Sequence, residues 1–123
     1  MADHGIPYVA TASIAFPDDF IAKAAKARDM SAGFRYIHVH GPCAPGWQFP
    51  ESKVVEIARL AVECGMWLLY EVENGERRLT CRPSPRKPVR EYLLRQGRFS
   101  HLGDEEIEEI QRQVDRSCEK YGM

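Results

Sequence analysis

FRYIHVHGPCAPGW, residues 34–47, is the stretch that decides the fold, because an apolar strand runs directly into a loop bracketed by proline and glycine. Side chains alternate between the faces of a strand, and here both faces carry apolar or aromatic residues. This pattern predicts a strand that is at least partly buried on both sides. Gly41–Pro42 ends it and Pro45–Gly46 turns the chain again, so Cys43 is held on a stiff loop.

A strand and a helix are predicted before this stretch. Residues 8–14 (YVATASI) are small or β-branched, which is typical of a strand in the interior of a sheet. Pro17 opens a helix that residues 31–33 close. Its predicted apolar face consists of Phe20, Ile21, Ala24 and Ala25, and its polar face of Lys23, Lys26 and Arg28.

A second helix, a hairpin and a third helix follow the loop. Ser52 is the expected N-cap of the second helix and Gly65 its C′ residue, with a buried stripe of Val54, Ile57, Ala58, Ala61 and Val62. Asn74–Gly75 separates two β-type runs, 67–73 and 76–82, and predicts a two-residue turn in which Tyr70 faces Leu79 and Glu71 faces Arg78. The last helix starts at Asp104, and its narrow stripe is Ile107, Ile110, Val114 and Cys118.

Composition places these 123 residues among globular chains of near-neutral charge. Basic residues are scattered, which argues against nucleic acid, and no apolar run reaches the length of a membrane span. Residues 1–4 lack the pattern of a signal peptide, and the four separated cysteines are typical of reduced thiols, so we expect a cytoplasmic protein. No strand is predicted before the first interior strand, so a neighbouring strand is missing.

Four blocks of the chain resemble one known family. They are residues 5–20 (GIPYVATASIAFPDDF), 36–47 (YIHVHGPCAPGW), 58–75 (ARLAVECGMWLLYEVENG) and 86–102 (RKPVREYLLRQGRFSHL). In this order they are similar to the C-terminal part of the β subunit of pyruvate synthase and related 2-oxoacid:ferredoxin oxidoreductases. The resemblance covers nearly the whole chain but less than half of that subunit.

The resemblance implies an α/β fold, namely part of a thiamine diphosphate-binding-type fold with a parallel βαβα core, a β-hairpin and a C-terminal helix. It implies two segments: residues 1–82 carry the core with the hairpin, and residues 83–123 form a proline-rich connector and a docking helix. The reaction implied is CoA-dependent oxidative decarboxylation of a 2-oxoacid with electron transfer to ferredoxin. The chain would contribute to it only within a complex with the upstream β-subunit portion and the α, γ and δ subunits.

The resemblance also implies cofactors and site residues. The family's β subunit binds thiamine diphosphate with magnesium, and a 4Fe-4S cluster held by four cysteines. Cys43 matches the fourth cluster ligand, whereas the other ligands and the diphosphate motif have no counterpart in the chain. Thr11 and Ser13 fall in a stretch that lies beside the cofactor in the family.

Other interpretations of the same residues stay open. Cys43 taken alone is more often a small apolar residue in a turn, and His38, His40 and Cys43 could be three zinc ligands without a fourth. Cys64, Cys81 and Cys118 match no ligand position and are expected to fill core or surface. The rival function is a non-catalytic α/β interaction module or a degenerate fragment.

Overall fold

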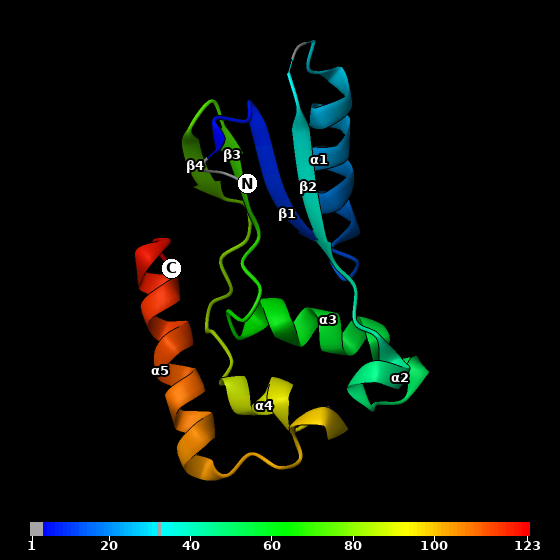
Figure 1. Cartoon of the computed structure of the whole chain (residues 1–123), viewed down its shortest axis with the longest axis vertical. Helices are drawn as coiled ribbons and strands as arrows, with labels where there is room; N and C mark the ends of the chain where they lie inside the picture. Colours follow the sequence, from blue (N-terminus) through cyan, green and yellow to red (C-terminus); the bar gives the residue numbers. More distant parts are fainter. Residues whose placement is uncertain (1–3, 32) are drawn as a thin grey trace.

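A four-stranded sheet and a cluster of helices below it make up residues 4–31 and 33–123, the part of the chain that the computed structural model describes (Figure 1). Residues 1–3, on which part of the signal-peptide prediction falls, and residue 32 lie outside it. The elements in chain order are β1 (Tyr8–Ser13), α1 (Pro17–Asp29), β2 (Arg35–His40), α2 (Ala44–Trp47), η2 (Glu51–Lys53), α3 (Val54–Glu63), β3 (Tyr70–Glu73), β4 (Glu76–Leu79), α4 (Val89–Leu93), η3 (Gly97–Phe99) and α5 (Asp104–Lys120). None of the helices among these residues is long and apolar enough to cross a membrane.

The sheet has the order β2-β1-β3-β4. β1 pairs in parallel with β2, and the connection between them is α1, as expected for a βαβ unit. β3 then pairs antiparallel with β1, so the sheet is mixed. All six residues of β1 are buried, which confirms that it is an interior strand.

The hairpin has the predicted turn and register. Asn74 and Gly75 have φ values of 50° and 88°, the left-handed pair that a type I′ turn requires. Tyr70 is opposite Leu79 and Glu71 is opposite Arg78. The strands are shorter than the predicted runs, since β3 begins at Tyr70 and β4 ends at Leu79.

A hydrophobic core lies among α3, α4 and α5, below the sheet. α3 buries Ile57, Ala58, Leu60, Ala61 and Val62, which confirms the predicted stripe apart from Val54, which is half-buried. Against it pack residues of α4 and α5, namely Val89, Tyr92, Leu93, Ile107, Val114 and Cys118. The predicted stripe of α5 is therefore confirmed apart from Ile110, which is half-buried against the same core. α3 shares its core with the C-terminal third of the chain.

The end of α3 matches the sequence prediction and its start does not. Gly65 follows the C-cap Cys64 with a φ of 84°, as a C′ glycine does. Ser52 is not the N-cap, because residues 51–53 form the short 3-10 helix η2 and Lys53 occupies the cap position without a side-chain bond.

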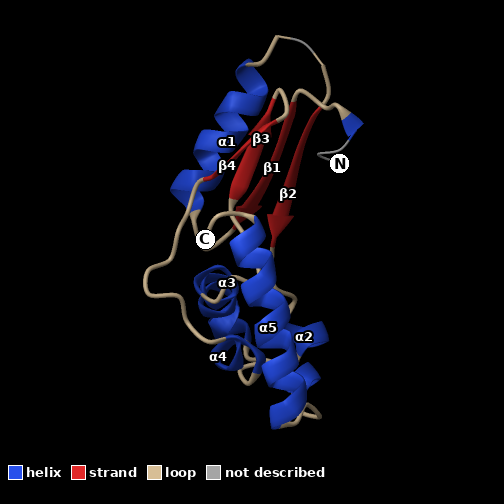
Figure 2. Ribbon diagram, turned by 90° about the vertical axis from the view of Figure 1, so that its left-hand side faces the viewer, coloured by secondary structure: helices blue, strands red, loops and turns tan. Residues whose placement is uncertain are grey.

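The predicted burial of α1 is wrong. Figure 2 shows α1 on one face of the sheet, but the side chain that it buries there is Lys23, 3% exposed. Ile21 is 65% exposed, and Ala24 also faces solvent. Lys23 and Lys26 point toward the sheet because it presents polar groups to them, as described below, whereas Arg28 is exposed. Of the predicted apolar face, Phe20 and Ala25 are half-buried.

The burial of β2 is smaller than its apolar sequence predicts. Tyr36, Ile37 and His40 are half-buried, while His38 and Val39 are exposed. The reason is position: β2 is an edge strand, and within the described residues only β1 pairs with it.

Candidate functional site

Cys43 lies on the loop that connects β2 to α2, at the N-cap position of α2. Its carbonyl oxygen accepts a hydrogen bond from the Trp47 amide at 2.9 Å, which closes the loop onto the helix. The side chain makes no cap bond, is exposed and is a free thiol. The Sγ atom lies over Gly46, where an added Cβ would come within 3.3 Å of it. The loop therefore presents one thiol to solvent from a braced backbone.

A row of rings runs beside this loop, and we call it the aromatic row: His38, Trp67, His40, Trp47 and the stacked guanidinium of Arg98. The His38 and Trp67 ring centroids are 4.9 Å apart, and those of His40 and Trp67 are 5.2 Å apart. The ring centroids of His40 and Trp47 are 5.8 Å apart, and the Arg98 guanidinium lies 3.8 Å from the Trp47 ring centroid. Trp67 is fixed by donating its indole N–H to the Ala12 carbonyl oxygen at 3.0 Å.

His40 is the most constrained member of the row. Burial lowers its pKa, and the positive charge of Arg98 and the neighbouring His38 lower it further, so the ring is neutral at physiological pH. Its Nδ1 is buried without a hydrogen-bond partner in the described part of the chain. The zinc alternative gains no support, because the described residues contain no group of three His, Cys, Asp or Glu that could hold a metal ion.

Thr11 and Ser13 lie at the carboxyl end of β1. In the parallel register, Thr11 is opposite His38 and Ser13 is opposite His40, so both are close along the sheet to the Cys43 loop. Their hydroxyl groups are already engaged within the chain. Thr11 Oγ1 donates to the Leu68 carbonyl oxygen at 2.6 Å and accepts the Tyr70 amide at 3.0 Å.

Ser13 is fully buried, and its Oγ accepts the Ala15 amide at 3.3 Å. These two hydroxyls therefore hold the end of β1 in place. Whether they also line a cofactor region stays a prediction.

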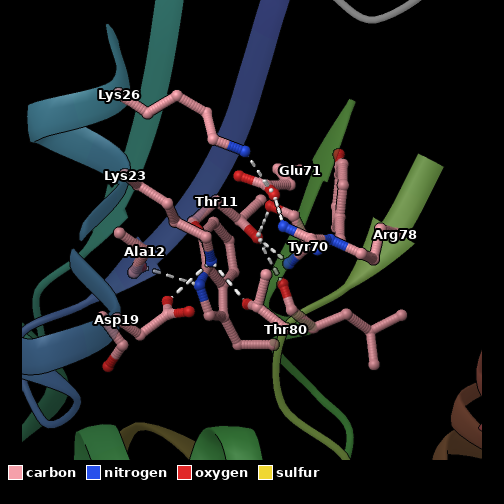
Figure 3. Close-up of polar contacts among 12 residues, drawn as sticks. Thr11, Ala12, Asp19, Lys23, Lys26, Tyr70, Glu71, Arg78 and Thr80 are labelled. Atoms are coloured by element: carbon pink, nitrogen blue, oxygen red, sulfur yellow. Dashed lines mark hydrogen bonds and ion pairs between the residues drawn. The ribbon is translucent and has the colours of Figure 1, made fainter. Parts of the chain in front are cut away.

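A buried lysine joins α1 to the sheet. The Lys23 ammonium donates to the Thr11 carbonyl oxygen at 2.8 Å, to Thr80 Oγ1 at 2.7 Å and to the Asp19 carboxylate at 2.6 Å (Figure 3). All three of its donors are thus satisfied, which is the condition for burying a charge. The sequence pattern did not predict this site, although the i,i+4 spacing of Asp19 and Lys23 was a visible signal.

A second buried charge, Glu71 of β3, also faces α1. It accepts hydrogen bonds from the Tyr8 hydroxyl at 2.8 Å, from Lys26 at 2.9 Å and from Arg78 (Figure 3). Burial favours the protonated form, but the bonds from Lys26, Arg78 and Tyr8 outweigh it and lower the pKa of Glu71 to about 2. Burial and the same carboxylate raise the pKa of Tyr8. This cluster is a structural anchor of α1 and offers no free group for chemistry.

The side chains of the other three cysteines are buried or half-buried, as predicted. Cys64 and Cys118 are buried at 0% and 1% exposure, and burial raises the pKa of Cys64 to about 11. Cys81 is half-buried, and burial raises its pKa too. Among the four thiols, only that of Cys43 is exposed.

Comparison with known proteins gives the class of protein. No protein-family profile matches the chain. It is 57% identical over 120 residues to pyruvate synthase subunit PorB of Methanothermobacter marburgensis, which covers 98% of this chain and 41% of that protein. It is 54% identical over 123 residues to PorB of Methanocaldococcus jannaschii. It is 45% identical over 120 residues to ketoisovalerate oxidoreductase subunit VorB of Pyrococcus furiosus.

The chain is therefore related to the β subunits of 2-oxoacid oxidoreductases. More particularly, it corresponds to a C-terminal portion of the pyruvate synthase β subunit, PorB, as the four sequence blocks predicted. It spans about two fifths of the length of these relatives, 41% for both PorB sequences.

Proposed function

We propose that this chain forms part of the β subunit of a pyruvate synthase-like oxidoreductase and has no activity of its own. In the proposed reaction, the carboxylate of a 2-oxoacid leaves as carbon dioxide, the acyl group passes to the thiol of CoA, and two electrons pass to ferredoxin. The observation that carries the proposal is the identity of 57% with PorB, which extends over 98% of the chain. The proposed partners are the remaining part of the β subunit, the α, γ and δ subunits, and ferredoxin.

Cys43 is proposed as the fourth ligand of a 4Fe-4S cluster. The thiol fits this role because it is exposed, is free and lies between Pro42 of the loop and Pro45 in the first turn of α2. It fits as a single ligand, since the described residues around it supply no further set of donors. When bound, such a cluster accepts electrons one at a time. The contribution of this chain is to hold the thiolate in place at the N-terminal end of α2.

Thiamine diphosphate with magnesium is proposed for the intact complex. The residues present do not form a diphosphate site by themselves, because Thr11 and Ser13 use their hydroxyls within the chain. We propose that these two residues line the cofactor region by holding the end of β1, without donating to the cofactor. The proposed location is the cytoplasm, where free thiols such as these four persist.

The division at residue 82 is also a proposal. Residues 1–82 would carry the thiamine diphosphate-type core, and residues 83–123 would dock on partner subunits. Docking through α5 would use its outer face, where Glu105, Glu108 and Arg112 are exposed, because its apolar stripe packs inside the chain.

A chimeric subunit tests the cluster assignment. The chain replaces the 120 matching residues of M. marburgensis PorB, and the chimera is expressed without oxygen together with the other subunits. We expect iron and visible iron-sulfur absorption in the purified subunit, and Cys43→Ser should remove most of both. The matched control is Cys81→Ser, which changes a thiol that corresponds to no ligand and should leave both unchanged.

Two results would contradict this proposal. Full iron content and activity in the Cys43→Ser chimera would show that Cys43 is not a ligand. A folded chimera that assembles with its partners but carries no iron and no activity would instead favour the non-catalytic interaction module.

A further inference from the structure

The two edges of the sheet are not alike. β4 is only four residues long, and Glu76, Arg77 and Arg78 on it are exposed. A short, charged edge strand disfavours pairing with a further strand. β2 has six residues, RYIHVH, and one formal charge. Within residues 4–31 and 33–123, only β1 pairs with it. An edge with this composition is suited to receive another strand.

The hydrogen bonds show which groups of β2 face the open side. The His40 carbonyl oxygen accepts the Ile14 amide at 3.3 Å, so the backbone polar groups of His40 point toward β1. These groups alternate along a strand, so those of Ile37 and Val39 point away from β1. Val39 is 37% exposed, and its amide is available for pairing.

α1 lies beside this strand (Figure 1). Lys23 and Lys26 face the sheet, where Thr11, Thr80, Glu71 and Glu73 accept their hydrogen bonds. The remaining side of the helix therefore carries Ile21, 65% exposed, with Ala22 and Ala24, both exposed as well. Asp18, Arg28 and Asp29 of α1 are exposed as well, so the apolar part of this surface is the patch formed by Ile21, Ala22 and Ala24.

We propose that the open edge of β2 and the outer face of α1 form one docking surface, which receives a strand and an apolar face from the remaining part of the β subunit. The relatives support this occupant, because 41% of PorB matches this chain and about three fifths of it lies elsewhere. This inference rests on the proposed function for the identity of the occupant. The rival occupant is a second copy of this chain.

Co-expression in two pieces tests the docking surface. The tagged chain is expressed with M. marburgensis PorB from which the 120 matching residues are removed, and the recovery of that piece is measured. We expect stoichiometric recovery. Val39→Pro, which removes an outward amide, should lower recovery about tenfold, a loss of about 1.4 kcal/mol. Val39→Thr keeps the amide and should recover as the unchanged chain does.

A second pair of variants leaves the strand untouched. Ile21→Glu places a charge on the outer face of α1 and should also lower recovery, because the charge would be buried on docking. Val55→Glu is the matched control, since Val55 of α3 is similarly exposed, at 54%, on another surface. Unchanged recovery with both Ile21→Glu and Val39→Pro would overturn the proposal. So would an absence of recovery with the unchanged chain.

The second-copy occupant has its own signature. The 14.1 kDa chain would then run as a dimer, twice that mass or about 28 kDa, and Val39→Pro would convert it to a monomer. That outcome would overturn the remaining part of the β subunit as the occupant of the docking surface, and would leave the relation to PorB unchanged. The recovery assay is done in air and needs no iron, whereas the chimera needs no docking because it is one chain. Failure of this inference and failure of the proposed function are thereby distinguished.

Discussion

Replacing Glu71 by glutamine should lower the free energy of unfolding by about 2–3 kcal/mol at pH 7. Glu71 is 4% exposed and has a pKa of about 2 in the folded chain, against an ordinary value of 4.5. At 1.36 kcal/mol for each unit of difference, the charged form is stabilised by about 3 kcal/mol on folding. Solvent screens the exposed guanidinium of Arg78, which is why the lower end of the range is included.

The pH dependence of the Glu71 effect follows from the sign of its pKa change. Because the folded pKa lies below the unfolded one, the stabilisation is complete above about pH 4.5 and is lost as the pH falls toward 2. The difference between the original chain and Glu71→Gln should therefore shrink by about half between pH 7 and pH 3. Glutamine can still accept the hydrogen bond from Tyr8, so the variant isolates the charge.

Urea unfolding followed by tryptophan fluorescence at these two pH values measures the Glu71 effect. The matched control is Glu76→Gln, an exposed position in the same hairpin, where we expect a change within about 0.5 kcal/mol. The reasoning would be refuted if Glu71→Gln were as stable as the original chain at pH 7. It would also be refuted if the difference in the free energy of unfolding between the two proteins were as large at pH 3 as at pH 7.

Two further predictions concern the helical core and the thiols. Gly65→Ala should lower the free energy of urea unfolding by about 1–2 kcal/mol, because the residue has a φ of 84° and its new Cβ would lie 2.6 Å from Cys118 Sγ. The control is Gly41→Ala, whose new Cβ would have nothing within 4 Å and which should lower the free energy of unfolding far less. Iodoacetamide in native buffer should modify Cys43 first and leave Cys64 unmodified until urea unfolds the chain, as peptide mass spectrometry would show. Equal rates at the two thiols would mean that the loop or the core is not arranged as described.

Sequence signals that act over a few residues predicted the structure well. Asn74–Gly75 fixes a type I′ turn through its own φ values, and the register of the hairpin follows from the turn. Gly65 likewise ends α3 through its own conformation. Such features depend little on the rest of the fold, so the local sequence was enough.

The orientation of α1 was mispredicted for a physical reason. Its apolar period alone favours burial of Ile21, but the lysines of the helix meet acceptors outside it. Glu71, which accepts from Lys26, and Thr80, which accepts from Lys23, are both more than forty residues away. Three satisfied donors on Lys23 make its burial favourable, and of their acceptors only Asp19 lies within residues 17–29.

The candidate site was predicted from resemblance more than from pattern. Cys43 stands alone in the sequence, and only its match to a family position singled it out as a ligand. The aromatic row beside it was not predicted, because Trp47 and Arg98 are fifty-one positions apart and meet only in the folded chain. Neither residue carries a local signal for this contact.

The exposure of Cys43 has a consequence for anyone who handles the purified chain. A single accessible thiol can be oxidised in air, and two chains can then join through an intermolecular disulfide. Such a covalent pair would have the mass of a dimer even if the two chains did not pair through β2. A reducing agent in every buffer, or Cys43→Ser in experiments that need no cluster, separates this artefact from true self-association.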